Sequence, residues 1–151
     1  MRFQPRTPEF DTAVRGSFAR QGAMGAIGAE FLDVWPMVCR IRLRRCEATT
    51  QQHGFFRGGI IATIAAVAGG YAAMALCPPS TEELTVKFKV NFVAPAKCAA
   101  LVATGRVVRA GRTLIVTRID FDALDESGQA TECAILQQTI MAVVHSGSGR
   151  Q

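Results

Sequence analysis

The uncharged segment at residues 58–76 constrains the fold more than any other part of the sequence. As a helix rising 1.5 Å per residue it would be about 28 Å long, which reaches the lower range for a membrane span. Its four glycines, its excess of alanine over leucine and the strand-like sequence after it instead favour a helix buried in a protein core. We therefore predict a long helix covered by a sheet, with Gly69 and Gly70 allowing close contact between the two.

The length of 151 residues leaves room for one main domain. Residues of the set AVILMFWYC make up 49% of the chain and charged residues 19%, which excludes a disordered chain and predicts apolar surface buried in an oligomer. The five cysteines form no Cys-x-x-Cys pair, so no zinc site is indicated, and their odd number argues against a disulfide framework. With no apolar stretch near the start, we expect a cytoplasmic protein.

A short helix is predicted at the N-terminus. Thr7, Pro8 and Glu9 have the residue types of a helix start, and the apolar residues that follow at helical spacing are Phe10, Val14 and Phe18. We expect this helix to end near Gly22. The predicted organisation is thus an N-terminal helix at residues 1–22 packed on a domain at residues 23–145, followed by a disordered tail at residues 146–151.

Six strands are predicted from alternating and apolar runs separated by turn residues. They span residues 26–34, 37–46, 84–93, 98–109, 113–124 and 129–144. The last four are long and joined by short turns, which is typical of an antiparallel meander. Within residues 85–92, polar Thr85, Lys87, Lys89 and Asn91 alternate with apolar side chains, so one face is expected to be packed and the other wet. The fold class is α+β, with one long helix against about six antiparallel strands.

Three motifs occur along the chain in a fixed order. Gly54-Phe55-Phe56-x-Gly58-Gly59 precedes the long helix, Asn91-Phe92-x-x-Pro95 lies in a strand, and Gly111-Arg112-Thr113 lies in a later turn. Together they resemble the hot-dog acyl-CoA thioesterases of the phenylacetate-degradation type, from about residue 25 to residue 143. The resemblance implies a hot-dog fold, in which an antiparallel sheet wraps a long central helix.

The resemblance also implies a catalytic arrangement. The N–H of Gly58 would donate to the thioester carbonyl, because a helix N-terminus offers unpaired N–H donors and about half a positive charge to a developing oxyanion. Gln51 would orient the acyl group or the attacking water, and a carboxylate two turns into the helix would act as base or nucleophile. That position is occupied by Ala66, and residues 48–81 contain no acid at all. Arg57 stands where the family usually has histidine.

Other residues could replace the missing base. His53 is one possibility, since imidazole accepts a proton near neutral pH, although a loop histidine is more often solvated. Glu82 and Glu83 could reach the site of a neighbouring subunit, or they could form an ordinary solvated strand edge. Arg57 could bind an anionic part of the substrate or extend into solvent, and Gly59 is expected to contact the substrate as well.

The net charge of +5 favours anionic ligands. By resemblance, Arg109 and Arg112 lie where the phosphates of coenzyme A dock between subunits, and the arginine fork suits phosphate. A second row of arginines spans residues 40–45; it is either another phosphate patch or the wet face of a strand. No nucleic-acid motif accompanies these charges.

Two functions follow from this reading. The first is an acyl-CoA thioesterase, assembled as a dimer or as a dimer of dimers, with its site between subunits and no cofactor beyond the coenzyme A of its substrate. The second is a protein that binds or senses acyl-CoA without hydrolysing it, since Ala66 removes the usual carboxylate. The two differ in whether free thiol is released.

Overall fold

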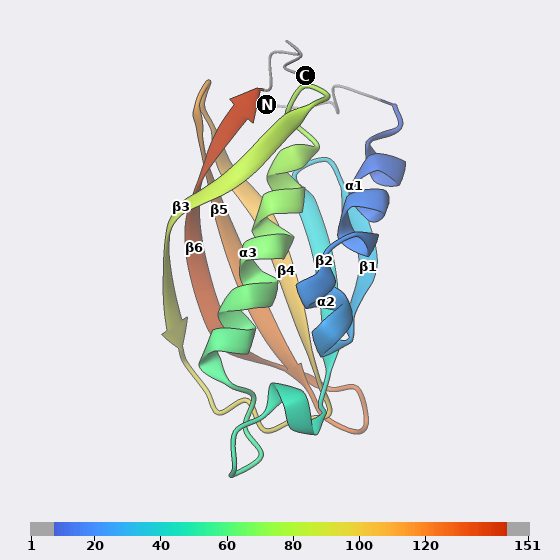
Figure 1. The fold of residues 1–151 in the computed structure, drawn as a ribbon. Helices are drawn as coiled ribbons and strands as arrows, with labels where there is room; N and C mark the ends of the chain where they lie inside the picture. The colour runs from blue at the N-terminus through green and yellow to red at the C-terminus, as the bar shows by residue number, and fades with distance from the viewer. Residues whose placement is uncertain (1–7, 145–151) are drawn as a thin grey trace.

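The computed structural model describes residues 8–144 of the chain (Figure 1). Its helices are α1 (Phe10–Ala19), α2 (Gly22–Ile27), the 3₁₀ turn η1 (Glu47–Thr49) and the long α3 (Gly58–Met74). Its strands are β1 (Ala29–Trp35), β2 (Val38–Arg44), β3 (Thr81–Phe92), β4 (Ala100–Ala110), β5 (Leu114–Leu124) and β6 (Ala130–Val144).

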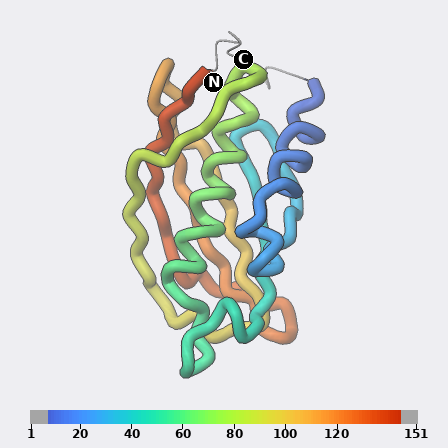
Figure 2. Tube along the Cα trace, viewed as in Figure 1, coloured from blue at the N-terminus to red at the C-terminus, as the bar shows by residue number. Residues whose placement is uncertain are grey.

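The six strands form one sheet in the order β1-β2-β4-β5-β6-β3, and every neighbouring pair is antiparallel. Figure 1 shows α3 lying against this sheet, with β3 along one side and α1 and α2 on the other. The Cα trace in Figure 2 follows β4, β5 and β6 up and down behind α3 as a meander. The expected architecture of one long helix against six antiparallel strands is confirmed.

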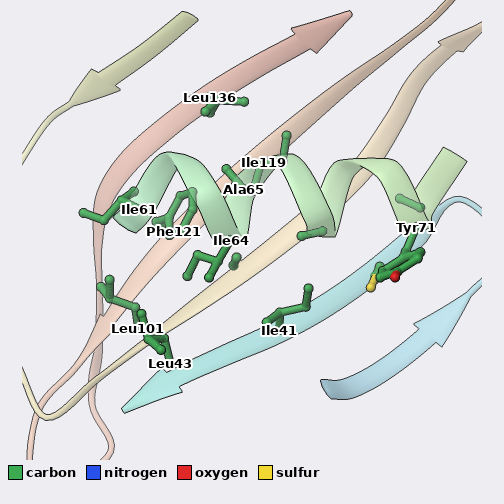
Figure 3. Packing of buried hydrophobic residues seen from close by; sticks show 14 of the residues in the cluster. Ile41, Leu43, Ile61, Ile64, Ala65, Tyr71, Leu101, Ile119, Phe121 and Leu136 are labelled. Atoms are coloured by element: carbon green, nitrogen blue, oxygen red, sulfur yellow. The ribbon is translucent and has the colours of Figure 1, made fainter. Parts of the chain in front are cut away.

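The helix α3 is buried because its apolar residues meet apolar residues of the sheet. Ile61, Ile64 and Ala65 have no more than 1% of their surface exposed, and they point toward buried side chains from several strands (Figure 3). Each fully buried isoleucine contributes about 1.5–3 kcal/mol of hydrophobic free energy. Close approach also depends on Gly105 of β4, where a Cβ atom would lie 2.5 Å from the carbonyl oxygen of Ala68.

Gly69 and Gly70 of α3 differ in how much space a side chain would have at each position. A Cβ atom on Gly69 would overlap the side-chain oxygen of Gln138 and lie 2.7 Å from Oγ1 of Thr117, so glycine is needed there for the helix to sit on the sheet. A Cβ atom on Gly70 would meet no heavy atom within 4 Å. The packing role predicted for both glycines is therefore confirmed for Gly69 and wrong for Gly70. In the described residues no helix has the length and apolarity needed to cross a membrane.

The N-terminal region folds differently from the single helix that was expected to end near Gly22. Two helices occupy it, since α1 ends at Ala19 and α2 begins at Gly22. Gly28, with φ of 70°, ends α2 in the left-handed conformation, so the first strand begins at Ala29 and not at residue 26. Local patterns do not show where a chain reverses within a polar and small-residue segment.

The predicted apolar face of the first helix is confirmed. Val14 is fully buried, and Phe10 and Phe18 pack against the core. The N-cap is Glu9, without a side-chain hydrogen bond. The predicted cap Thr7 and the predicted tail at residues 146–151 lie outside the described residues.

Strand β3 has less buried surface than its alternation predicts. It is an edge strand, so only β6 pairs with it, and Phe88 and Phe92 remain 46% and 54% exposed although they lie opposite the buried Gln138 and Ala134. A β-bulge between Thr85 and Lys87 also shifts the register. Thr85 therefore lies opposite the buried Ile140, on the face toward the helix, and not on the wet face.

Candidate functional site

The N-terminus of α3 presents free backbone donors. Arg57 is the N-cap in an extended conformation, and its carbonyl accepts from the N–H groups of Ile60 and Ile61 at 3.0 and 3.1 Å. In the part of the chain that the structure describes, no side chain caps this end of α3. The N–H groups of Gly58 and Gly59 are thus oriented along the helix axis without a capping acceptor.

The surroundings of the two glycines differ. A Cβ atom on Gly58 would lie 3.0 Å from the ring of Phe92 on β3, whereas one on Gly59 would meet nothing within 4 Å. The half-exposed ring of Phe92 therefore forms an apolar wall beside the helix start. Backbone donors next to an apolar surface are suited to a carbonyl group that carries an acyl chain.

Gln51 and His53 lie in the loop before α3. The N–H of His53 donates to the side-chain oxygen of Gln51, and the N–H of Gln51 donates to the carbonyl of Phe55 at 2.9 Å. The imidazole is exposed, and Gln51 lines an open groove at the loop. Neither residue is among the described residues that line the cavity beside Ala66.

A cavity of about 400 Å³ lies beside the middle of α3. Ala66, Gly70 and Met74 form its helix wall, and residues 81–85 of β3 form the wall opposite. Its end is built by Tyr71, whose hydroxyl accepts from Gln21 at 2.7 Å and donates to Ser17 at 3.0 Å. The position of the expected carboxylate therefore borders a space that a small molecule or waters can enter.

Glu83 of β3 lines the same cavity as Ala66. Its Oε1 atom is buried without a hydrogen-bond partner among the described residues. Burial raises the pKa of the Glu83 carboxyl to about 7, against smaller lowering effects of its own backbone N–H and of the Cys77 thiol. The structure thus places a carboxyl group of near-neutral pKa across the cavity from Ala66.

A buried glutamine that the sequence reading missed joins the two walls of this cavity. Gln138 of β6 is 1% exposed, and its amide donates to the carbonyl of Ala66 at 3.2 Å and to Oγ1 of Thr85 at 2.7 Å. Its oxygen accepts from the hydroxyl of Thr117 at 3.2 Å. The available signal was a glutamine placed between Leu136 and Ile140, two apolar residues at inward positions of the same strand.

Arg112 lies at the opposite end of α3 from Gly58. It belongs to the turn between β4 and β5, which Gly111 closes by donating its N–H to Leu114 at 2.9 Å (Figure 1). Arg112 lines a cavity of about 530 Å³ beside Cys77, which follows the C-terminal end of α3. Arg109 is exposed on β4 and does not line that cavity. One chain therefore does not bring Arg112 and Gly58 together, since a 17-residue helix separates them by about 25 Å.

The row of arginines on β2 is paired with acids of β1. Arg40 bonds Asp33 at 3.2 Å, Arg44 bonds Glu30 at 2.7 Å, and Arg42 also bonds Glu30. Arg42 and Arg44 lower the pKa of Glu30 through these hydrogen bonds. Of the two readings of this row, the pairing favours the wet face of a strand over a phosphate patch.

Comparison with known proteins identifies relatives of this chain. The model of the thioesterase superfamily matches residues 53–128, which include the Gly-Gly step, Ala66 and Arg112. Putative esterase SSO1253 of Saccharolobus solfataricus is 30% identical over 108 residues, 72% of this chain and 69% of that protein. Putative esterase SSO2140 of the same organism is 33% identical over 79 residues, which are 52% of this chain and 56% of that protein. The match thus spans little more than half the length of this second relative.

Solved structures show the same fold. A thioesterase family protein from Silicibacter pomeroyi superimposes with a TM-score of 0.84 at 38% identity, covering 87% of this chain and 96% of that one. The PaaI protein of E. coli, from the phenylacetic acid degradation operon, superimposes with a TM-score of 0.75 at 14% identity, over 87% of this chain and 91% of that chain. The second likeness concerns the fold alone.

The family model, the 30% identical relative and the superposition over 87% of this chain agree with one another. The resemblance inferred from the sequence motifs is therefore confirmed at the level of family and fold. The chain belongs to the thioesterase superfamily and has the hot-dog fold.

Proposed function

We propose that this protein hydrolyses an acyl or aryl thioester of coenzyme A in a site formed between two subunits. The observation that carries the proposal is the uncapped start of α3, where the N–H groups of Gly58 and Gly59 lie beside the half-exposed ring of Phe92. In a chain of the thioesterase superfamily, this arrangement fits a thioester carbonyl and its acyl chain.

Hydrolysis of a thioester requires a group that stabilises negative charge on the carbonyl oxygen. Attack of water on the thioester carbonyl places negative charge on its oxygen, and preorganised N–H donors at a helix N-terminus stabilise that charge. A single such donor is worth about 3–4 kcal/mol of transition-state stabilisation. The remaining requirement is a group that accepts the proton of the attacking water.

Distances along α3 support a site shared by two copies. Gly58 and Ala66 are eight residues apart, which is about 12 Å along a helix, and Arg112 lies beyond the far end. One thioester cannot meet all three in a single chain. A second copy running antiparallel to the first would bring the helix start of one chain near the middle of α3 in the other.

The edge strand β3 supports such a pairing. Its outer edge is free in the described residues, and four of its apolar side chains are about half exposed: Leu84, Val86, Phe88 and Phe92. A free edge with apolar side chains favours pairing with another strand, and a second β3 offers the same groups in return.

The proposal is tested by measuring thiol release from a panel of short, long and aromatic acyl-CoA thioesters. We expect turnover above background for at least one class, and we expect Ala66→Asp to raise it, because that substitution restores the carboxylate that the family usually has. His53→Ala tests whether His53 accepts the proton of the attacking water, the role that its imidazole could fill.

A second function is favoured by Ala66 itself, which leaves α3 without an acid. A protein that binds acyl-CoA and does not hydrolyse it would show micromolar affinity by calorimetry with no thiol release. That result would overturn the hydrolase proposal and support the binding function.

A further inference from the structure

For a thioesterase of the proposed kind, this chain is unusual because Ala66 stands where the family usually has a carboxylate. Ala66 borders a cavity of about 400 Å³, and the opposite wall carries Glu83. An acid supplied by the strand, and not by the helix, is thus available at the same cavity.

The register of the sheet orients Glu83 toward this cavity. Glu83 lies opposite Ala142 of β6, and Thr85 lies opposite the buried Ile140, so the two β3 residues share the face toward α3. Thr85 is linked to the carbonyl of Ala66 through the amide of Gln138. Glu83 lies two residues before Thr85 on β3, about 7 Å from it along the strand, a gap that a glutamate side chain and one water molecule can span.

No positively charged side chain faces the Glu83 carboxyl from the described walls of the cavity. Of the described residues that line the cavity, none is a lysine, arginine or histidine. The titratable groups around Glu83 are Glu82 on its own strand, Tyr71 on α3 and Cys77 after α3. The carboxyl interacts with the Cys77 thiol, but its buried Oε1 atom has no hydrogen-bond partner among the described residues, which costs folding free energy, so stability does not account for a glutamate at this place.

We propose that Glu83 is the general base for thioester hydrolysis, in place of the carboxylate absent at position 66; this inference rests on the proposed function. The water oxygen bonds to the acyl carbon while one water proton passes to the Glu83 carboxylate. The carbonyl oxygen, now negative, is held by N–H groups at the start of the partner copy's α3. The C–S bond then breaks, the carbonyl re-forms, and the proton on Glu83 passes to the departing sulfur, giving a free acid and coenzyme A.

The test compares Glu83→Gln with the wild type and with Glu132→Gln, a matched change at an exposed glutamate of β6. The inference predicts that Glu83→Gln lowers kcat by about 10²- to 10⁴-fold with KM changed by less than about threefold, the usual effect of losing a general base. Glu132→Gln is expected to keep the wild-type kcat. Circular dichroism and thermal unfolding check that each variant is folded.

A double variant separates catalysis from structure. If Glu83 acts as the base, Ala66→Asp raises the turnover of Glu83→Gln at least tenfold more than it raises that of the wild type, because only in the variant does it replace a missing carboxylate. If Glu83→Gln fails to fold, Glu83→Asp keeps the charge on a shorter side chain and is expected to retain part of the activity.

The outcomes distinguish the two proposals. Full activity of folded Glu83→Gln overturns the role of Glu83 and leaves the thioesterase proposal in place. Absence of turnover by the wild type across the whole acyl-CoA panel overturns both. Loss of activity in Glu83→Gln without rescue by Ala66→Asp also overturns the role as base, since it indicates a structural effect.

Discussion

The side-chain amide of Gln138 donates a hydrogen bond to the main-chain carbonyl oxygen of Ala66 over 3.2 Å. The same amide donates to Thr85 on β3, and its oxygen accepts from Thr117 on β5. One buried side chain thus holds the middle of α3 and the start of β3 at a set separation. The cavity between Ala66 and Glu83 depends on that separation.

Replacing Gln138 tests this linkage. Gln138→Leu leaves the hydroxyls of Thr85 and Thr117 without their partner, and we expect it to lower the free energy of unfolding by about 1–3 kcal/mol. Gln137→Leu, at the exposed neighbouring position, is expected to change it by less than about 0.5 kcal/mol. Urea unfolding measures both, and equal effects of the two changes would contradict the assigned role of Gln138.

The two adjacent glycines of α3 provide a matched pair. Gly69→Ala forces a methyl group against Gln138 and Thr117, so we expect destabilisation by about 1–3 kcal/mol from overpacking. Gly70→Ala enters open space, and we expect stabilisation of up to about 1 kcal/mol, because alanine is the better helix former. Thermal unfolding midpoints should move in opposite directions, and movement in the same direction would be inconsistent with this packing.

The proposed subunit contact at β3 can be broken by charge. Phe88→Glu places a carboxylate among the half-exposed apolar groups of β3, and we expect light scattering to show a shift from dimer or tetramer toward monomer. Because the proposed site needs two chains, thioesterase activity should fall in parallel. Val108→Glu, at a 63% exposed position of β4, serves as the control. A monomeric wild type, or a monomeric variant with full activity, would contradict the shared site.

Arg112 can be tested with one thioester that carries the nucleotide phosphates of coenzyme A and one that lacks the whole nucleotide. Arg112→Ala is expected to raise KM for an acyl-CoA about tenfold, the equivalent of about 1.4 kcal/mol of binding, with KM for an acyl-N-acetylcysteamine unchanged. Arg118→Gln, an exposed arginine paired with Asp120, controls for loss of one positive charge. Similar increases for both substrates would exclude a phosphate contact.

The raised pKa of Glu83 predicts a pH dependence of stability. Its carboxyl has a pKa of about 7 in the folded protein against the usual 4.5, so the folded state holds this proton more tightly than the unfolded state does. The resulting stability is fully present below pH 4.5 and is lost as the pH rises to about 7. Glu83→Gln lacks this loss, because the amide does not ionise.

The measurement is denaturant unfolding of the wild type and Glu83→Gln between pH 4 and pH 8. We expect the stability of the variant relative to the wild type to increase between pH 4.5 and about 7 and to stay constant from there to pH 8. Glu82, Tyr71 and Cys77 surround Glu83 and are present in both proteins, so the comparison isolates the Glu83 carboxyl. If the free energies of unfolding of the two proteins ran parallel across this pH range, burial would not raise the pKa of the Glu83 carboxyl.

Several features were determined by the sequence alone, because each depends on residues close together in the chain. The uncharged run predicts α3, and its start at Gly58 is as expected from the Gly-Gly step. Alternation in β2 predicts which side chains face the core, since successive residues of a strand point to opposite faces. The motifs around Gly58, Asn91 and Arg112 indicate the family, which the comparisons confirm.

Only the tertiary structure decided which distant residues share a space. The bond between Gln138 and Ala66 joins positions 72 residues apart, and the bulge after Thr85 and the edge position of β3 depend on pairing with β6. The placement of Glu83 across the cavity from Ala66 also depends on the pairing of β3 with β6. Periodicity in a sequence reports the face of each element, whereas register and packing between elements are set by the shapes of both partners. These contacts place the Glu83 carboxyl on the wall of the cavity that faces Ala66.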